Sequence, residues 1–206
     1  MQITLEKVSK RFQKHWIFKN ISYTFTPQSP CALLGANGSG KSTLLRIIAG
    51  MQTPSPGKIT WQNEEGNNIP QAQVFNYISF SAPGQEIIDE LTLQEFFDFH
   101  FSFKRPLPGL SISDIIALTG LQSAAAKPIG DYSSGMRQRV KLAHAIFSDT
   151  PALLLDEPCT NLDQQGVEQY RSWIRQYGKN RLIIVASNDL REYFFCKEQI
   201  AIEAYK

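Results

Sequence analysis

Cysteine is scarce in this chain of 206 residues, and long apolar runs, internal repeats and low-complexity segments are absent. Its three cysteines are widely spaced and match no metal-binding pattern, so the sequence predicts small buried side chains in a reducing compartment. No stretch approaches the roughly 18 apolar residues of a membrane-spanning helix, and the first residues lack the apolar core of a signal peptide. We therefore expect a chain that does not cross a membrane by itself.

Charge of one sign is not in excess either. The formal net charge is +2, and no run of five or more basic residues occurs. These features argue against a nucleic-acid partner and against broad attraction to an anionic membrane. The length is sufficient for a substantial core, and we predict a single domain over residues 1–206.

A glycine-rich stretch matches the pattern G-x-x-x-x-G-K-[ST], a loop whose backbone N–H groups surround phosphate oxygens. Its glycines allow the backbone to approach the phosphates closely. The lysine is expected to contact the β- and γ-phosphates of a nucleotide, and the following serine hydroxyl to contact Mg²⁺. The residues of this phosphate loop are Gly35, Ala36, Asn37, Gly38, Ser39, Gly40, Lys41, Ser42 and Thr43.

The flanking residues supply the context that such a loop requires. Residues 31–34 form a short apolar run that predicts a buried strand leading into the loop. Residues 43–49 carry the apolar spacing of a helix, which Gly50 ends. Bound phosphates would therefore lie at a helix N-terminus.

The rest of the chain alternates between strand and helix patterns. Period-2 patterning predicts strands at 2–8 and 20–26, with a polar loop at 10–16 between them, and later strands are predicted at 58–61, 74–79, 152–155 and 182–186. Such alternation predicts an α/β fold: a core of mostly parallel sheet with helices on both faces, and an N-terminal antiparallel β subdomain.

The middle of the chain reads as a helical lobe at about 84–135, inserted in the α/β core. Thr92 to Glu95 and Ser111 to Asp114 predict helix starts, and the first helix carries five phenylalanines. These are too many for one helical stripe, so most are expected in the core and a few on the surface. A further helix is predicted to start at Ser133.

Two adjacent carboxylates follow the buried run at 152–155. Asp156 is placed to join the shell of a Mg²⁺ ion, and Glu157 is placed to polarise an attacking water. An Asp-Glu pair after a strand is weak evidence alone, but it gains weight beside a phosphate loop.

With these motifs in this order, the sequence resembles the ATP-binding subunits of ABC transporters over nearly the whole chain. The matching segments are the Walker A loop at 35–43, the signature motif at 132–139, the Walker B strand with its glutamate at 153–158, the D-loop at 161–163 and the switch loop at 185–189. The resemblance implies a P-loop NTPase core, ATP and Mg²⁺ as cofactors, and a head-to-tail dimer with ATP between the two subunits.

The resemblance also implies individual roles. Ser133, Ser134 and Gly135 of the signature loop would act on the ATP of the partner subunit, and Asp163 would belong to the D-loop. Phe12 matches the aromatic residue that stacks on adenine, with Trp16 as the rival. For either ring, packing against the core is the alternative.

Three positions depart from the family pattern. The signature reads Tyr132-Ser133-Ser134-Gly135-Met136, a style that looks like the export-type branch. The glutamine expected to contact Mg²⁺ is absent from its usual place, and Gln85 is the nearest candidate. The switch-loop histidine is replaced by Asn188, which is expected to act as a catalytic residue beside Glu157. Its amide can donate a hydrogen bond to the γ-phosphate but cannot become cationic. Because Glu157 is retained, we expect slow hydrolysis rather than none.

Two functions follow from the resemblance. The first is an ATP-hydrolysing subunit that powers a separate integral-membrane transporter subunit, for export, and acts as a cytoplasmic protein at the inner face of the membrane through that partner. The alternative is a weakly hydrolysing, ATP-binding regulatory module or the degenerate half of an asymmetric ABC pair. Asn188 and the missing glutamine favour the alternative, and Glu157 and the signature loop favour the first.

Overall fold

A computed structural model describes residues 1–206 without gaps and divides the chain into two compact units. The first unit comprises Met1–Phe80, Pro151–Glu157 and Asn180–Lys206, and the second comprises Ser81–Thr150 and Pro158–Lys179. The phosphate loop and both carboxylates of the 156–157 pair belong to the first unit. The signature motif and the D-loop belong to the second.

A three-stranded antiparallel sheet, ordered β2-β1-β4, opens the first unit. Its strands are β1 (Gln2–Phe12), β2 (His15–Phe25) and β4 (Lys58–Gln62). Strands β1 and β2 extend through most of the predicted polar loop, because Arg11 pairs with Trp16 and Phe12 with His15 across the hairpin. The prediction of a loop at 10–16 was therefore wrong, since cross-strand pairing continues where apolar alternation stops.

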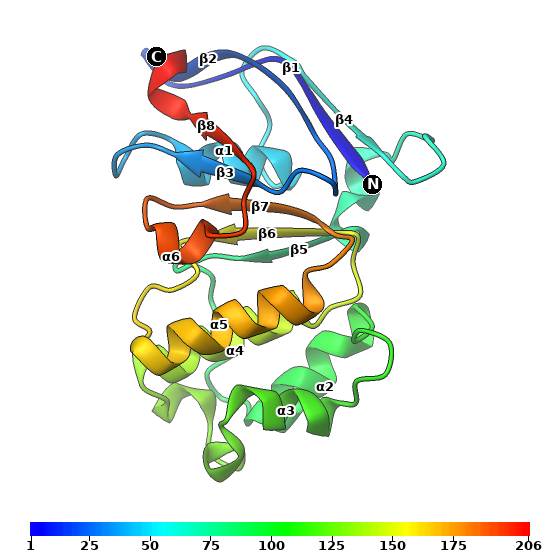
Figure 1. Ribbon diagram of the computed structural model, residues 1–206, viewed down its shortest axis with the longest axis vertical. Helices are drawn as coiled ribbons and strands as arrows, with labels where there is room; N and C mark the ends of the chain where they lie inside the picture. The colour runs from blue at the N-terminus through cyan, green and yellow to red at the C-terminus, as the bar shows by residue number, and fades with distance from the viewer. The chain divides into compact units, whose positions relative to one another are not determined.

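The second sheet of this unit has five strands in the order β5-β6-β7-β3-β8 (Figure 1). They are β3 (Cys31–Leu34), β5 (Ile78–Ser81), β6 (Ala152–Asp156), β7 (Leu182–Ala186) and β8 (Glu198–Ala201). The pairs β6–β7, β7–β3 and β3–β8 are parallel. Every residue of β6 and β7 is buried, as expected for parallel strands covered on both faces. Strand β3 lies between β7 and β8, so the loop that follows it lies at the carboxyl ends of three strands.

One apolar cluster fills the first unit and joins both sheets to helix α1 (Lys41–Ile48). Leu44, Leu45 and Ile47 of the helix are fully buried in it. The indole Nε1 of Trp61 on β4 donates to the carbonyl oxygen of Ile48 over 2.8 Å and so fixes the end of the helix against the antiparallel sheet. This packing holds α1, and with it the phosphate loop at its N-terminus, in place.

The segment predicted as a strand at 74–79 is divided between two elements. Residues Gln71–Asn76 form a 3-10 helix, η1, and the strand β5 begins only at Ile78. Pro70 precedes the helix as its N-cap, and only Val74 within the helix is buried. The Tyr77 N–H donates to the Val74 carbonyl oxygen. One buried residue with exposed neighbours on both sides does not show the alternating burial of a strand, and the prediction of a strand was wrong there.

The second unit is built from helices α2 (Leu93–Phe103), α3 (Ile112–Thr119), α4 (Ser134–Ile146) and α5 (Gln164–Tyr177), with short 3-10 turns η2 (Gln122–Ala124) and η3 (Ile129–Asp131). Both predicted capping boxes are present: Thr92 with Glu95, and Ser111 with Asp114. Three of the five phenylalanines of α2 are buried and two are exposed, as the composition of that helix predicted. The unit extends beyond the predicted lobe at 84–135, because α4 and α5 belong to the same body.

Near its end the chain forms helix α6 (Leu190–Tyr193) and the 3-10 helix η4 (Ile202–Tyr205). In Figure 1 the red C-terminal segment follows β8, the neighbour of β3 in the five-stranded sheet, and η4 lies against β2 of the antiparallel sheet. None of the helices has both the length and the apolar character needed to span a bilayer.

Candidate functional site

The phosphate loop has the backbone shape that its glycines allow. Gly40 has φ +108, and a Cβ at this position would collide with the Ile17 side chain of β2. Gly35 has φ +149, and a Cβ there would lie 2.5 Å from Ser39 Oγ and 2.8 Å from a carboxylate oxygen of Glu203. Both positions therefore require glycine. Gly40 is required by its backbone conformation and its contact with β2, and Gly35 by the close approach of the loop to Ser39 and Glu203.

Polar groups inside the loop suit an anionic ligand. The Lys41 ammonium, 5% exposed, donates to the carbonyl oxygens of Gly35 over 2.5 Å and Ala36 over 3.3 Å. The Ser39 hydroxyl is buried and has no hydrogen-bond partner. A desolvated cation and an unsatisfied hydroxyl at a helix N-terminus fit a nucleotide's phosphates.

The side chains of Ser42 and Asp156 form a hydrogen bond next to the loop. The Ser42 hydroxyl donates to Asp156 Oδ1 over 3.0 Å, and Asp156 is buried at the end of β6. Burial raises the pKa of the Asp156 carboxyl above its ordinary value, while the hydrogen bond from Ser42 opposes that shift. An alcohol and a carboxylate are ligands suited to Mg²⁺. The chain has no cluster of three or more His, Cys, Asp or Glu, so a Mg²⁺ ion here would need ligands from nucleotide phosphate or water as well.

Glu157 has an unusual backbone at the carboxyl end of β6. Its φ is +43, in the left-handed region, and its N–H donates to the Ala186 carbonyl oxygen of β7 over 2.9 Å. A non-glycine residue in this region costs on the order of 1–3 kcal/mol and is found most often at functional sites. The strain supports a functional role for the carboxylate next to Asp156.

Asn188 pairs with the first residue of the loop through both ends of its amide. Asn188 Oδ1 accepts from the Gly35 N–H over 3.0 Å, and Asn188 Nδ2 donates to the Gly35 carbonyl oxygen over 2.6 Å. The side chain predicted to face the γ-phosphate is therefore engaged by the loop backbone in this structure. Its proposed catalytic role stays a prediction.

Glu203 contacts the phosphate loop, and sequence reasoning missed it. Its Oε1 accepts from the Ala36 N–H over 2.6 Å, and this bond is the main reason that the pKa of the carboxyl is lowered. No motif marks this position, and the only available signal is the apolar run at 200–202, which indicates a final strand next to the loop.

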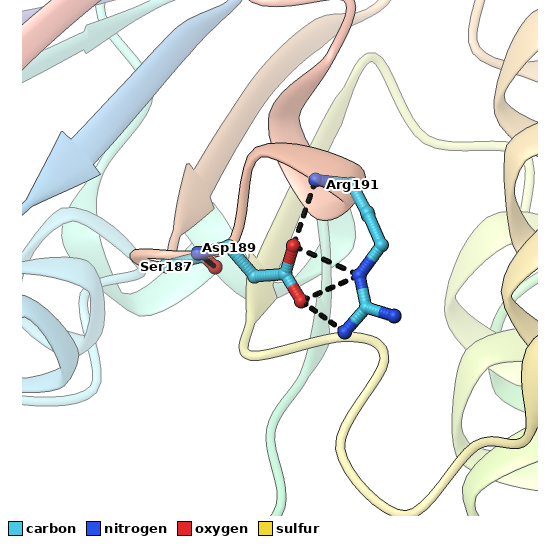
Figure 2. Close-up of polar contacts among 3 residues, drawn as sticks. All are labelled: Ser187, Asp189 and Arg191. Carbon is cyan, nitrogen blue, oxygen red and sulfur yellow. Dashed lines mark hydrogen bonds and ion pairs between the residues drawn. The ribbon is translucent and has the colours of Figure 1, made fainter.

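The residues on either side of Asn188 form a closely hydrogen-bonded turn (Figure 2). The Asp189 N–H donates to Ser187 Oγ over 2.8 Å. The Asp189 carboxylate caps α6 by accepting from the Arg191 N–H, and it accepts from the Arg191 guanidinium at 2.6 to 3.1 Å. Hydrogen bonding by Arg191 lowers the pKa of Asp189 below its ordinary value. The turn therefore fixes the backbone from which Asn188 projects.

The two candidate adenine-stacking rings lie at the end of the β1–β2 hairpin. Phe12 is 47% exposed and Trp16 is 41% exposed. Arg11 and Lys19 lie over the Trp16 ring at 5.6 and 5.5 Å from its centre, and Lys10 lies 5.2 Å from the centre of Phe12. The indole thus has two cationic neighbours and the phenyl ring one, and Phe12 is the more exposed of the two. Stacking of either ring on adenine stays a prediction.

The signature motif lies at the start of α4 in the second unit. Ser133 caps this helix, its Oγ accepting from the Met136 N–H over 3.3 Å, and Ser134 is the first helical residue. A Cβ on Gly135 would lie 3.0 Å from the Asn161 carbonyl oxygen, so the D-loop passes close to the helix start. Asp163 caps α5 and accepts from Arg139 of α4 over 3.3 Å. Signature and D-loop are thus joined within this unit.

Gln85 lies in a different environment from the one predicted. Its Nε2 lies 3.1 Å from His144 Nε2 of α4, and its Oε1 is buried without a partner. His144 Nδ1 lies 3.4 Å from the Val140 carbonyl oxygen, which favours a proton on Nδ1 and leaves Nε2 to accept from Gln85. Contact of Gln85 with Mg²⁺ stays a prediction.

His144 and its neighbour His100 should make stability depend on acidity. Burial, the main cause, lowers the pKa of His144 to about 3 and that of His100 to about 4, against 6.5 in the unfolded chain. Between pH 6.5 and the lowered pKa of each histidine, the unfolded chain therefore binds more protons than the folded chain. We expect the free energy of unfolding to fall as the pH falls from about 6.5 towards 4, by at most about 1.4 kcal/mol per pH unit for each histidine.

Denaturant unfolding at several pH values would test this expectation. The slope in the wild-type chain should exceed that in His144→Gln, in which the buried imidazole is absent. Equal slopes in the wild type and in His144→Gln would show that His144 does not contribute to acid sensitivity.

Comparison with known proteins places the site in a family. Residues 18–160 match the ABC transporter family. The chain belongs to it. This ABC ATP-binding chain is 31% identical to the uncharacterised ABC transporter ATP-binding protein YybJ of Bacillus subtilis, over 98% of the chain and 91% of that protein.

The names of other relatives of this ABC chain describe opposite directions of transport. It is 31% identical to the sulfate/thiosulfate import ATP-binding protein CysA of Mesostigma viride, over 98% of the chain and 59% of that protein. It is 29% identical to the cytochrome c biogenesis ATP-binding export protein CcmA of Agrobacterium fabrum, over 91% of the chain and 89% of that protein. Importers and exporters both occur among the relatives, so the comparisons do not fix the export-type branch.

Solved structures confirm the fold of the ABC chain. An ABC transporter ATP-binding protein from Pyrococcus furiosus matches with a TM-score of 0.80 and 20% identity, over 100% of both chains. A dimeric ATP-binding cassette in a post-hydrolysis state with ADP and Pi matches with a TM-score of 0.81 and 21% identity, over 97% of this chain and 94% of that one. The predicted P-loop NTPase fold, with a parallel sheet, a separate antiparallel sheet and helices, is therefore confirmed.

Proposed function

We propose that this chain binds Mg-ATP at Gly35–Thr43 and hydrolyses it to power a separate membrane-spanning ABC transporter subunit. The observation that carries the proposal is the group of Lys41, Ser42, Asp156 and Glu157 around one phosphate loop. The Lys41 ammonium is buried under the loop, Ser42 is bonded to Asp156, and Glu157 follows directly. A cation, an alcohol–carboxylate pair and an adjacent carboxylate are the residue types that phosphoryl transfer to water uses, and this supports the proposal.

Each residue has a distinct part in this proposal. Lys41 and the loop N–H groups bind the phosphates, and Ser42 with Asp156 holds Mg²⁺, with Gln85 as a further candidate ligand. When bound, Mg²⁺ supplies neutralisation of the phosphate charge. Glu157 accepts a proton from the attacking water, which makes the water a better nucleophile.

Slow hydrolysis is part of the proposal. Position 188 offers no imidazole, and the Asn188 amide is hydrogen-bonded on both sides to Gly35. Loss of one donor that contacts transition-state charge costs about 10²–10³-fold in rate elsewhere. The same observation favours the second candidate function, a weakly hydrolysing regulatory module or the degenerate half of an asymmetric pair.

The proposed assembly is a head-to-tail dimer with ATP between subunits. Ser133, Ser134 and Gly135 would contact the partner's ATP from the N-terminus of α4, a helix end that attracts anions. The lobe at about 84–135 would dock the membrane subunit at the cytoplasmic face. Export is the proposed direction, supported by the signature style and by the name of the relative CcmA, and opposed by that of CysA.

Dimerisation gives the first test. In Glu157→Gln, a shape-preserving change that slows hydrolysis, ATP should persist and hold two chains together. Size-exclusion chromatography with light scattering should show a monomer without nucleotide and a dimer with Mg-ATP, more fully populated in the variant than in the wild type. ADP should give no dimer. A Glu157→Gln chain that binds ATP but stays monomeric, alone and with its membrane partner, would contradict the sandwich.

Reconstitution with the membrane subunit separates the two candidate functions. An ATPase subunit should gain activity in the presence of its partner in proteoliposomes, whereas a regulatory module should bind the partner without gain. Both the basal and the stimulated rates are needed, because absence of the partner lowers the rate of an intact site as well.

A further inference from the structure

We infer that Asn188 and Glu203 are positioning residues that clamp the first peptide of the phosphate loop, Gly35–Ala36, in the shape that binds nucleotide. The inference deepens the proposed function and rests on it for the ligand. Neither side chain needs to touch the phosphates, because both act through hydrogen bonds to the loop backbone. We call the two residues the loop clamp.

The clamp, together with Lys41, satisfies the polar groups of this peptide. Gly35 donates its N–H to Asn188 Oδ1, and its carbonyl oxygen accepts from both Asn188 Nδ2 and Lys41. Ala36 donates its N–H to Glu203, and its carbonyl oxygen accepts from Lys41. Two neighbouring residues thus have every backbone donor and acceptor engaged. The loop cannot change shape here without breaking at least one of these bonds.

The chemistry of position 188 fits this role. An amide carries its acceptor and its donor side by side, so it can pair with the N–H and carbonyl of a single residue. The reverse amide orientation would place donor against donor and acceptor against acceptor, so the two bonds assign Oδ1 and Nδ2. The two nitrogens of an imidazole point away from each other and cannot make this pair. Asn188 is thereby suited to hold Gly35 in a way that histidine is not.

The strands on either side of β3 place Asn188 and Glu203 next to the same peptide of the loop. Strand β7 ends next to β3, and the Ser187–Asp189–Arg191 turn fixes the backbone on either side of Asn188 (Figure 2). On the other side of β3, β8 pairs so that Ala201 lies opposite Leu34, the residue before the loop. Ile202 is fully buried and anchors η4, which leaves Glu203 directly at Ala36.

Glu203 has two opposing effects on a nucleotide. Its hydrogen bond to Ala36 orders the loop, but its negative charge repels phosphates. Glutamine keeps an acceptor oxygen for Ala36 and removes the charge, whereas alanine removes both. Loop ordering therefore predicts that Glu203→Gln binds ATP at least as tightly as the wild type and that Glu203→Ala binds more weakly. A residue that acted by charge alone would give tighter binding in both variants.

Two measurements on the full chain test the clamp. Amide hydrogen exchange, followed by NMR without nucleotide, should be at least about fivefold faster at Gly35 in Asn188→Ala and at Ala36 in Glu203→Ala. Calorimetric titration with ATP should show the dissociation constant rising about 5- to 20-fold in Asn188→Ala and about 2- to 10-fold in Glu203→Ala, the range for one or two lost hydrogen bonds. Asn188→Asp keeps the acceptor for the Gly35 N–H, so amide exchange at Gly35 should lie between that of Asn188→Ala and that of the wild type.

Matched surface changes serve as controls. Glu6→Ala on β1 and Asn67→Ala in the turn after β4 replace exposed residues of the same types and should alter neither readout. Unchanged exchange at Gly35 and Ala36 in both alanine variants would overturn the clamp, as would weaker binding in Glu203→Gln than in Glu203→Ala. Failure of the wild-type chain to bind ATP would instead overturn the proposed function, because the exchange measurement does not depend on nucleotide.

Discussion

Replacing Glu157 by glutamine should lower kcat for ATP hydrolysis about 10²–10⁴-fold, the range that a positioned general base contributes. The amide has nearly the same shape as the carboxylate but cannot accept the proton of the attacking water. Binding should change little, because the proposal places phosphate and metal contacts on Lys41, Ser42 and Asp156. The rate loss should therefore appear in kcat, with the dissociation constant for ATP within about threefold of the wild type.

Phosphate release under saturating Mg-ATP measures the first quantity and equilibrium titration the second. Glu6→Gln, at an exposed position on β1, is the matched control and should retain full activity. A Glu157→Gln chain that hydrolyses ATP at more than about a tenth of the wild-type rate would remove Glu157 from the catalytic role. Absent hydrolysis in the wild type, with its membrane partner present, would favour the regulatory alternative instead.

Replacing Lys41 by alanine should weaken ATP binding about 10²-fold or more. Lys41 is almost fully buried under the loop and supplies the only formal positive charge among residues 35–43. Charge-assisted hydrogen bonds contribute about 1.5–3 kcal/mol each, so the loss of two bonds to phosphate oxygens accounts for this factor. The variant also loses the bonds to the Gly35 and Ala36 carbonyl oxygens, which adds disorder in the empty loop.

Equilibrium binding of a fluorescent ATP analogue, confirmed by calorimetry with ATP, gives the affinity. Lys58→Ala on β4 removes an exposed lysine outside the loop and should bind normally. Thermal unfolding of each variant without nucleotide separates loss of affinity from loss of folding. An affinity within threefold of the wild type in a folded Lys41→Ala chain would refute the assignment of residues 35–43 as the nucleotide site.

Much of this protein could be predicted from local sequence, because the relevant signals are short-range. The capping boxes at Thr92 and Ser111 satisfy helix N–H groups three residues away, so they mark helix starts whatever surrounds them. The continuous apolar runs of β6 and β7 are typical of strands buried on both faces. The phosphate loop and the fold that contains it follow from nine consecutive residues and the elements on either side. The family comparison and the fold agree with these predictions.

What only the tertiary structure decided depends on partners that are distant in the chain. The β1–β2 hairpin continues through polar residues because each strand supplies the other's hydrogen bonds. The 3-10 helix η1 stands where a strand was predicted, and Val74 is its one buried residue. Asn188 and Glu203 contact the loop across 153 and 167 residues. No local pattern encodes such a contact, since it exists only where parallel strands β7, β3 and β8 align their carboxyl ends. The sequence alone determined that position 188 lacks histidine, and the alignment of the strands decided that its amide pairs with Gly35.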